Sequence, residues 1–122
     1  MIFRAVKRYE RLSPLKARRI LRIIKGKDVP TARALLEFYH SRSKIPILKT
    51  LNSAVSNLKN RVGKVRIDDK DLYVKEAIAQ DGPQMKRWRP GFRGTADMIR
   101  RRTCHIKIVI DSYKPIPIKK GE

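Results

Sequence analysis

The residues of this chain whose types and spacing are best suited to chemistry are the cations between positions 84 and 102, QMKRWRPGFRGTADMIRRR. Seven Lys and Arg stand there against one acid, Asp97, so the net charge of these 19 residues is +6. The guanidinium group of arginine is a planar fork that binds phosphate and stacks on nucleobases. Trp88 and Phe92 add rings on which bases can stack, although Trp88 could instead pack on its own segment. The pattern predicts RNA binding by Lys86, Arg87, Arg89, Arg93, Arg100, Arg101 and Arg102.

The sequence contains no pattern typical of catalysis or of a metal site. His40 and His105 lie in unrelated contexts, and paired carboxylates, a nucleophile elbow and a phosphate-binding glycine loop are missing. Cys104 and His105 are neighbours on a predicted strand, so they point to opposite faces and do not suit zinc. The one acidic cluster consists of Asp68, Asp69 and Asp71. Because it lacks the glycine of a calcium loop, we interpret it as turn residues and expect no enzyme, metal, cofactor or small-molecule substrate.

The whole chain is strongly basic, with 31 Lys and Arg against 11 Asp and Glu and a formal charge of +20 over 122 residues. That charge repels itself in a compact monomer, so we expect a polyanionic partner. An anionic membrane would satisfy charge alone, but Pro90, Gly91 and Gly94 prevent the basic stretch from forming one amphipathic helix. We also find no run of about 18 apolar residues and no secretory signal. One cysteine excludes an internal disulfide and suits a reducing compartment.

Two predicted strands flank the basic stretch. Residues 104–110 give the clearest alternation of apolar and polar side chains, and residues 72–79 place Leu72, Val74 and Ile78 on one face. A turn at 81–83 then takes the chain out of the sheet. The simplest geometry continues both strands into a two-stranded hairpin over about residues 80–103, with arms of about nine residues and a reach of roughly 30 Å. An isolated ribbon is marginal in water, so a partner must hold it.

The remaining elements supply a strand and three helices. Residues 1–10 predict an edge strand with Phe3, Ala5 and Tyr9 on one side. Ser13 and Pro14 begin a helix, by hydroxyl capping and by a proline suited to the first turn, and Gly26 ends it. Its apolar stripe is Ala17, Ile20, Leu21 and Ile24. Its polar face holds Lys16, Arg18, Arg19, Arg22 and Lys25 without an acid. A solvated face usually mixes charges, so this one predicts phosphate contacts.

Two further helices complete the predicted core. The spacing of apolar residues predicts a short helix over residues 31–40, with Ala32, Leu35, Leu36 and Tyr39 facing the core. Residues 46–61 should form the longest helix, with Ile47, Leu51, Ala54, Leu58 and Val62 inward. Asn52, Asn57 and Asn60 could face RNA or solvent. Segregated helices and strands indicate an α+β fold, a three-helix layer on a small three-stranded antiparallel sheet with a long extended basic hairpin. We expect one domain over 1–111 and an extended tail over 112–122.

An ordered set of short motifs resembles the family of ribosomal large-subunit protein twenty-two, of bacterial or organellar type, over about residues 4–111. The motifs run in the order Ser13-Pro14 with Lys16 and Arg18, Gly26-Lys27, Ser53-Ala54 with Asn57, Leu72-Tyr73-Val74, Asp81-Gly82-Pro83, Lys86-Arg87 with Arg89-Pro90, Arg93-Gly94, Ala96-Asp97, Arg101-Arg102-Thr103 and His105-Ile106. Each piece is weak alone, but the order and spacing together are specific.

The resemblance implies a domain on the outer face of the large ribosomal subunit, beside the opening of the peptide exit tunnel. The hairpin would thread through the rRNA, with its tip lining the tunnel opposite the extension of the fourth large-subunit protein. Partners would be large-subunit rRNA, neighbouring ribosomal proteins and the nascent polypeptide, with no membrane partner, in a ribosome of the cytoplasm or of an organelle. In the family the tip also influences macrolide action and nascent-chain stalling.

The resemblance and the charge pattern together give two sets of site residues. The expected rRNA-binding residues are Ser13, Lys16, Arg18, Arg19, Arg22, Lys86, Arg87, Arg89, Arg93, Arg100, Arg101 and Arg102. The expected tunnel tip is Lys86, Arg87, Trp88, Arg89, Pro90, Gly91, Phe92, Arg93 and Gly94.

The chain departs from the family pattern at the tip, where Gly91, Phe92 and Thr95 stand in place of the common Arg, Ala and Arg, and at Leu58, where Ala is common. A competing hypothesis is a free architectural protein that uses the same basic ribbon on RNA or DNA away from ribosomes.

Overall fold

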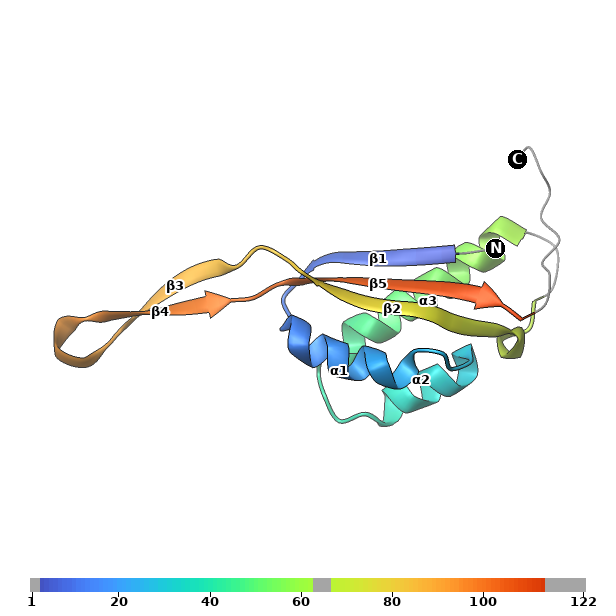
Figure 1. Ribbon diagram of the computed structural model, residues 1–122, viewed down its shortest axis with the longest axis horizontal. Coiled ribbons are helices and arrows are strands. Elements are labelled where there is room, and N and C mark those ends of the chain that lie inside the picture. Colours follow the sequence, from blue (N-terminus) through green and yellow to red (C-terminus); the bar gives the residue numbers. More distant parts are fainter. Residues whose placement is uncertain (1–2, 63–66, 114–122) are drawn as a thin grey trace.

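The chain folds into a three-stranded sheet covered on one face by helices, with a two-stranded ribbon extending from one end (Figure 1). The computed structural model describes residues 3–62 and 67–113, so most of the predicted tail and part of the loop after the third helix lie outside the described residues. The elements in chain order are β1 (Phe3–Glu10), α1 (Pro14–Ile24), α2 (Val29–Phe38), α3 (Lys44–Val62), η1 (Asp69–Asp71), β2 (Leu72–Asp81), β3 (Met85–Pro90), η2 (Phe92–Gly94), β4 (Ala96–Arg101) and β5 (Cys104–Ser112). This order confirms the predicted α+β fold.

The body sheet has the strand order β1-β5-β2, and both pairings are antiparallel. The predicted alternation of β5 is confirmed, because Cys104, Ile106, Ile108 and Ile110 are completely buried while His105 on the opposite face is partly exposed. β1 lies at an edge, as expected. β5 is therefore the centre of the sheet, and its apolar side chains form one wall of the core.

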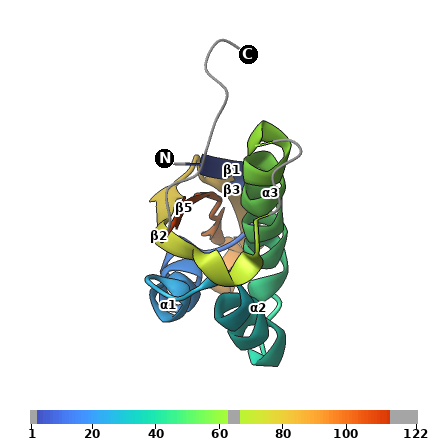
Figure 2. The same ribbon diagram turned by 90° about the vertical axis from the view of Figure 1, so that its right-hand side faces the viewer.

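The three helices pack on a single face of the sheet and leave the other face open (Figure 2). In α1 the predicted stripe is buried, and α3 is the longest helix, with 19 residues. Ile47, Leu51, Ala54 and Leu58 of α3 are fully buried, which confirms its role as the spine of the core. α2 begins and ends two residues before the predicted bounds, since Asp28 is its N-cap and a proline occupies its first turn.

Two irregularities in the strands overturn predicted side-chain directions. A register shift between Val74 and Glu76 adds a residue to β2, so Ala79 is buried and Ile78 points to the open face, opposite to its predicted side. A bulge reverses the alternation that follows it. In β1 the register shifts again between Lys7 and Glu10, and Tyr9, predicted on the same side as Ala5, is 66% exposed with φ of 56°.

The acidic cluster contains more than the turn residues we expected. Arg33 of α2 and Lys59 of α3 both reach Asp69, at 2.7 Å (Nη1 to Oδ2) and 2.9 Å (Nζ to Oδ1). Burial raises the pKa of the Asp69 carboxyl, but hydrogen bonds from Lys59 and Arg33 outweigh it and hold the pKa below its ordinary value of 3.8. Asp69 thus ties α2 and α3 to the segment that leads into β2. Across residues 3–62 and 67–113, no three His, Cys, Asp or Glu gather as metal ligands, and no helix is long and apolar enough to cross a membrane.

Candidate nucleic-acid interface

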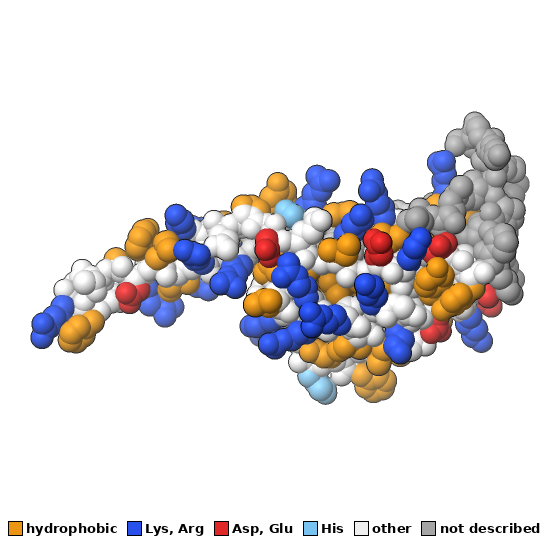
Figure 3. Space-filling model, viewed as in Figure 1, with side chains coloured by type: hydrophobic (Ala, Val, Ile, Leu, Met, Phe, Trp, Pro, Cys, Tyr) orange, Lys and Arg blue, Asp and Glu red, His pale blue; other side chains and the backbone are white. Residues whose placement is uncertain are grey.

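The hairpin is formed by β3 and β4, which make a two-stranded antiparallel sheet separate from that of the body. None of its strand residues is buried, so it has no hydrophobic core of its own. The predicted extended ribbon is confirmed. Figure 3 shows Lys and Arg side chains distributed along the ribbon and over the neighbouring part of the body.

The register of the ribbon brings like charges together. Lys86 lies directly opposite Arg100, and Trp88 lies opposite Met98 on the same face. Like charges facing each other across a strand pair destabilise it, so a bound polyanion would stabilise this end of the ribbon. Trp88 is 66% exposed, and most of its ring is therefore available to a partner rather than covered by the ribbon.

The tip of the hairpin is a tight turn that depends on Gly91. The Gly91 amide donates to the Thr95 carbonyl, and the Thr95 hydroxyl donates to the Phe92 carbonyl at 2.6 Å. A Cβ on residue 91 would lie 2.8 Å from Oδ2 of Asp97, so the absence of a side chain allows this close approach. Arg93 and Gly94 follow with positive φ, and the Arg93 guanidinium carbon lies 5.2 Å from the centre of the exposed Phe92 ring. The tip thus presents one aromatic ring with one cation beside it.

The root of the hairpin is a close crossing of two chain segments. The Gly82 amide donates to the Thr103 carbonyl at 2.9 Å, and the Thr103 hydroxyl donates to the Pro83 carbonyl. A Cβ on residue 82 would lie only 2.5 Å from Oγ1 of Thr103. A side chain at residue 82 would therefore clash with the Thr103 hydroxyl, which favours glycine where the chain leaves the body sheet, at the turn that the sequence predicted.

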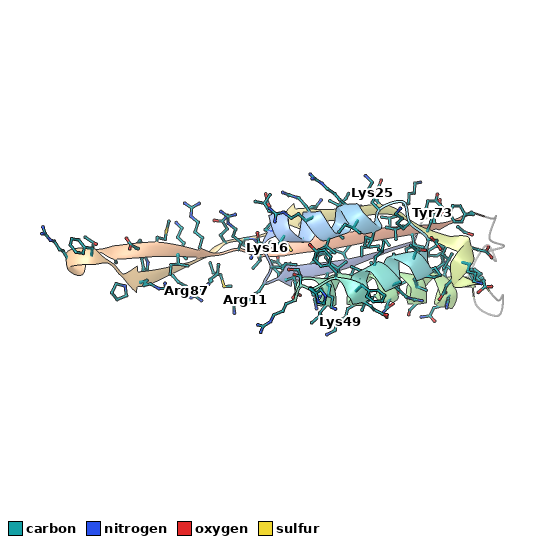
Figure 4. All side chains as sticks on the ribbon, turned by 90° about the horizontal axis from the view of Figure 1, so that it is seen from below. Arg11, Lys16, Lys25, Lys49, Tyr73 and Arg87 are labelled. Atoms are coloured by element: carbon teal, nitrogen blue, oxygen red, sulfur yellow. The ribbon has the colours of Figure 1, made fainter. Side chains whose placement is uncertain are left out.

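A recess at this root, which we call the junction recess, joins α1 to the base of the hairpin. It has a volume of about 370 Å³ and is lined by Arg11, Leu12, Ser13, Lys16, Arg100, Arg101 and Arg102. Figure 4 shows Arg11 and Lys16 at the end of the body from which the ribbon leaves. Five of its seven lining residues are cations and none is an acid, so it suits an anion.

The junction recess unites residues that the sequence could only propose separately. It brings Ser13 and Lys16 next to the triple arginine at 100–102. Ser13 is the N-cap of α1, but its side chain makes no capping hydrogen bond, contrary to our expectation, and the first turn has no acid. The positive end of the helix dipole therefore adds to the cations. Arg11 was missed by the sequence analysis, and its one signal was its position two residues before the N-cap Ser13.

The other predicted residues of α1 differ in their surroundings. Arg18 donates from Nε to the Ala79 carbonyl at 3.1 Å and lies 3.5 Å from Asp81, so it links α1 to β2. Arg19 and Arg22 are exposed on the same helix. Asn57, which we left open between RNA and solvent, donates to the Arg4 carbonyl at 3.2 Å.

Comparisons with known proteins agree on one family. The family model described as ribosomal protein L22p/L17e matches residues 5–111. The chain is also 43% identical over 112 residues to the large ribosomal subunit protein uL22 of Synechococcus sp. (strain JA-3-3Ab), covering 92% of this chain and 89% of that protein.

Proposed function

The chain belongs to the ribosomal protein L22p/L17e family, and on that premise we propose that it is a structural, rRNA-binding protein of the large ribosomal subunit whose junction recess anchors the basic hairpin in rRNA. One observation carries this proposal: cations that are distant in sequence, Arg11 and Lys16 on one side and Arg100 to Arg102 on the other, line one recess. Phosphate is the anion that such a set of guanidinium and ammonium groups binds best.

The anchor at the root explains how a ribbon without a core is held. RNA phosphates in the junction recess would neutralise the base of β4, and phosphates farther out would neutralise Lys86, Arg87 and Arg89. Neutralisation removes the repulsion between Lys86 and Arg100 across the ribbon. The predicted rRNA-binding residues on α1, including Arg19 and Arg22, would extend the same contact along the body.

We assign the tip to the wall of the peptide exit tunnel. The turn of the hairpin, residues 90–94, lies at the far end of the ribbon from the body (Figure 1), and residues 86–89 lead to it along β3. Phe92 in this turn is 80% exposed. With Gly91 and Phe92 in this turn, the turn itself offers the nascent polypeptide a ring and one cation, Arg93. The other cations of the expected tip, Lys86, Arg87 and Arg89, lie along β3. The ribosome that contains the protein would be that of the cytoplasm, with an organellar ribosome as the alternative.

Sedimentation tests the proposal. The tagged full-length protein should migrate with large ribosomal subunits through a sucrose gradient at moderate salt, and it should be released as the salt rises. Its affinity for isolated large-subunit rRNA should fall with salt with a slope of roughly 0.7 to 0.9 per neutralised phosphate. Migration outside the subunit fractions, with salt-dependent binding to any RNA or DNA, would instead identify a free architectural protein.

A further inference from the structure

The open face of the body sheet carries a second recess, separate from the junction recess. It has a volume of about 390 Å³ and is lined by Arg4, Val6, Arg8, Tyr9, Gln80, His105 and Lys107. These side chains alternate with Ala5, Ile106 and Ile108, which face the helices, so this recess lies on the face of the sheet that the helices leave open. We call this one the open-face recess.

The lining of the open-face recess is basic, and one acid, Glu76, lies in the same cross-strand row as Arg4 with Val109 between them. Arg4, Arg8 and Lys107 line it together and no acid does. Within residues 3–62 and 67–113, the cations that form ion pairs are Lys7, Arg18, Arg33 and Lys59 rather than these three. Three cations converging on one hollow suit a polyanion, and two exposed apolar side chains beside them, Val6 and Ile78, suit the flat faces of unpaired bases. Figure 3 views the molecule from this side and shows basic and hydrophobic side chains intermixed over the strands.

A strained residue shapes the rim of this recess. Tyr9 has φ of 56°, a conformation that costs a bulky residue energy and is often retained for a function. The bulge between Lys7 and Glu10 turns its ring outward. The Tyr9 ring meets the His105 ring edge-on, with 4.9 Å between the ring centres and 90° between the planes. The strain thus places an exposed aromatic ring beside the three cations.

The same contact fixes the hydrogen bonding of His105. The Tyr9 amide donates to Nδ1 of His105 at 3.0 Å. A neutral imidazole that accepts at Nδ1 carries its proton on Nε2. The Nε2 atom of His105 is therefore the hydrogen-bond donor that the ring offers at the recess. Gln80, paired with His105 across β2 and β5, adds an amide that can both donate and accept.

From these observations we propose that the open-face recess binds a second segment of single-stranded RNA, with phosphates on Arg4, Arg8 and Lys107 and one base stacked on Tyr9. The inference rests on the proposed rRNA-binding function and adds a partner segment on the face away from α1. The protein would then bind two RNA segments, one at the junction recess at the root of the hairpin and one at the open-face recess on the body sheet.

Histidine NMR signals of the full-length protein test this directly, because the chain has only two histidines. An oligouridylate of about 12 nucleotides serves as the probe. It should shift the ring signals of His105 and leave those of His40, which lies beyond the end of α2, in place. The variant R4Q/R8Q/K107Q should lose the His105 shift. The matched control R42Q/K49Q/R61Q removes two Arg and one Lys from exposed positions elsewhere and should retain it.

A separate variant tests the stacking of a base on Tyr9. Tyr9→Gly suits the positive φ and removes the whole side chain, including the ring, so it should fold and weaken the affinity read from the His105 shift about five-fold or more. Tyr113→Ala removes a tyrosine of similar exposure outside the recess and should not change that affinity.

The possible outcomes separate this proposal from the function on which it rests. RNA binding by the protein without any His105 shift would overturn the open-face recess and leave the junction recess intact. No RNA binding at all would overturn both. A shift of His105 by polyglutamate as large as the shift by RNA, at equal charge, would show an acidic protein segment to be the occupant and would also overturn the proposal.

Discussion

The body and the hairpin of this protein are organised by opposite physical effects. The body buries a continuous core that includes Leu51, Ile106 and Ile108, whereas no residue of β3 or β4 is buried. Burial of apolar surface stabilises the body without any partner, while the hairpin has its cross-strand hydrogen bonds and a line of cations. One short chain thus keeps its core and its most densely charged segment apart, since the hairpin, with a net charge of +6 over residues 84–102, contributes no buried strand residue to the core.

The largest expected effect lies in the core. Leu51→Ala removes a fully buried side chain from α3 and should lower the free energy of unfolding by about 2 to 5 kcal/mol. Ile99→Ala removes as many carbon atoms from the ribbon, where the residue is only partly buried, and should cost less than about 1 kcal/mol. Urea unfolding followed by circular dichroism measures both. Equal losses would mean that the hairpin contributes to the folded body as much as its core does.

The second prediction concerns rRNA binding, for which substitutions in the hairpin should have a large effect although they leave the stability nearly unchanged. Replacing Arg100, Arg101 and Arg102 with Gln should weaken binding to large-subunit rRNA roughly ten-fold or more at moderate salt and reduce the salt slope by about 2 to 3. The free energy of unfolding should stay within about 0.5 kcal/mol, because these side chains are exposed. Filter binding across a salt series gives both quantities, with R42Q/K49Q/R61Q as the charge-matched control. An unchanged salt slope would show that Arg100, Arg101 and Arg102 do not bind rRNA phosphates.

The boundary between the two regions should respond to a smaller change. Gly82→Ala places a methyl group against the Thr103 hydroxyl and should cost about 1 to 2 kcal/mol of stability, with weaker rRNA binding because the root is displaced. Adding Thr103→Ala removes the clashing oxygen, so the double variant should lose less than the sum of the single losses. Additive losses in urea unfolding would place the strain elsewhere.

The smallest predicted effect concerns Asp69 and depends on pH. Asp69→Asn should cost about 1 kcal/mol at neutral pH, because Arg33 and Lys59 lose a partly buried carboxylate. Since the pKa of this carboxyl is lower in the folded protein, the difference should be complete above the ordinary value of 3.8 and disappear as the pH falls through the lower folded-state value. Unfolding across acidic pH measures it, and Asp68→Asn, an exposed neighbour, serves as the control. A stability difference between the wild type and Asp69→Asn that grows on acidification would contradict the ion pairs of ionised Asp69 with Arg33 and Lys59.

Much of this fold could be predicted because the signals are local and periodic. The apolar spacing of α3, the alternation in β5 and the glycine and proline that end β2 each depend on a few neighbouring residues. The hairpin could be predicted from the composition of the basic stretch. A segment with seven cations and no periodic apolar residues cannot pack into a core, so it must lie on the outside of the body. For the same reason the predicted cations of β3 and β4 lie on an exposed ribbon, while their contacts with rRNA remain predictions.

The sequence by itself therefore determined the order of elements, the core-facing residues of the regular segments and the identity of the basic hairpin. Only the tertiary structure decided the rest: that Arg11 and Lys16 meet Arg100 to Arg102 at the hairpin root, and that bulges turn Ile78 and Tyr9 toward the open face. The physical reason is that a bulge is set by pairing with a distant strand, and a recess by where two distant segments cross. Neither leaves a period in the chain that a local reading of the sequence can detect.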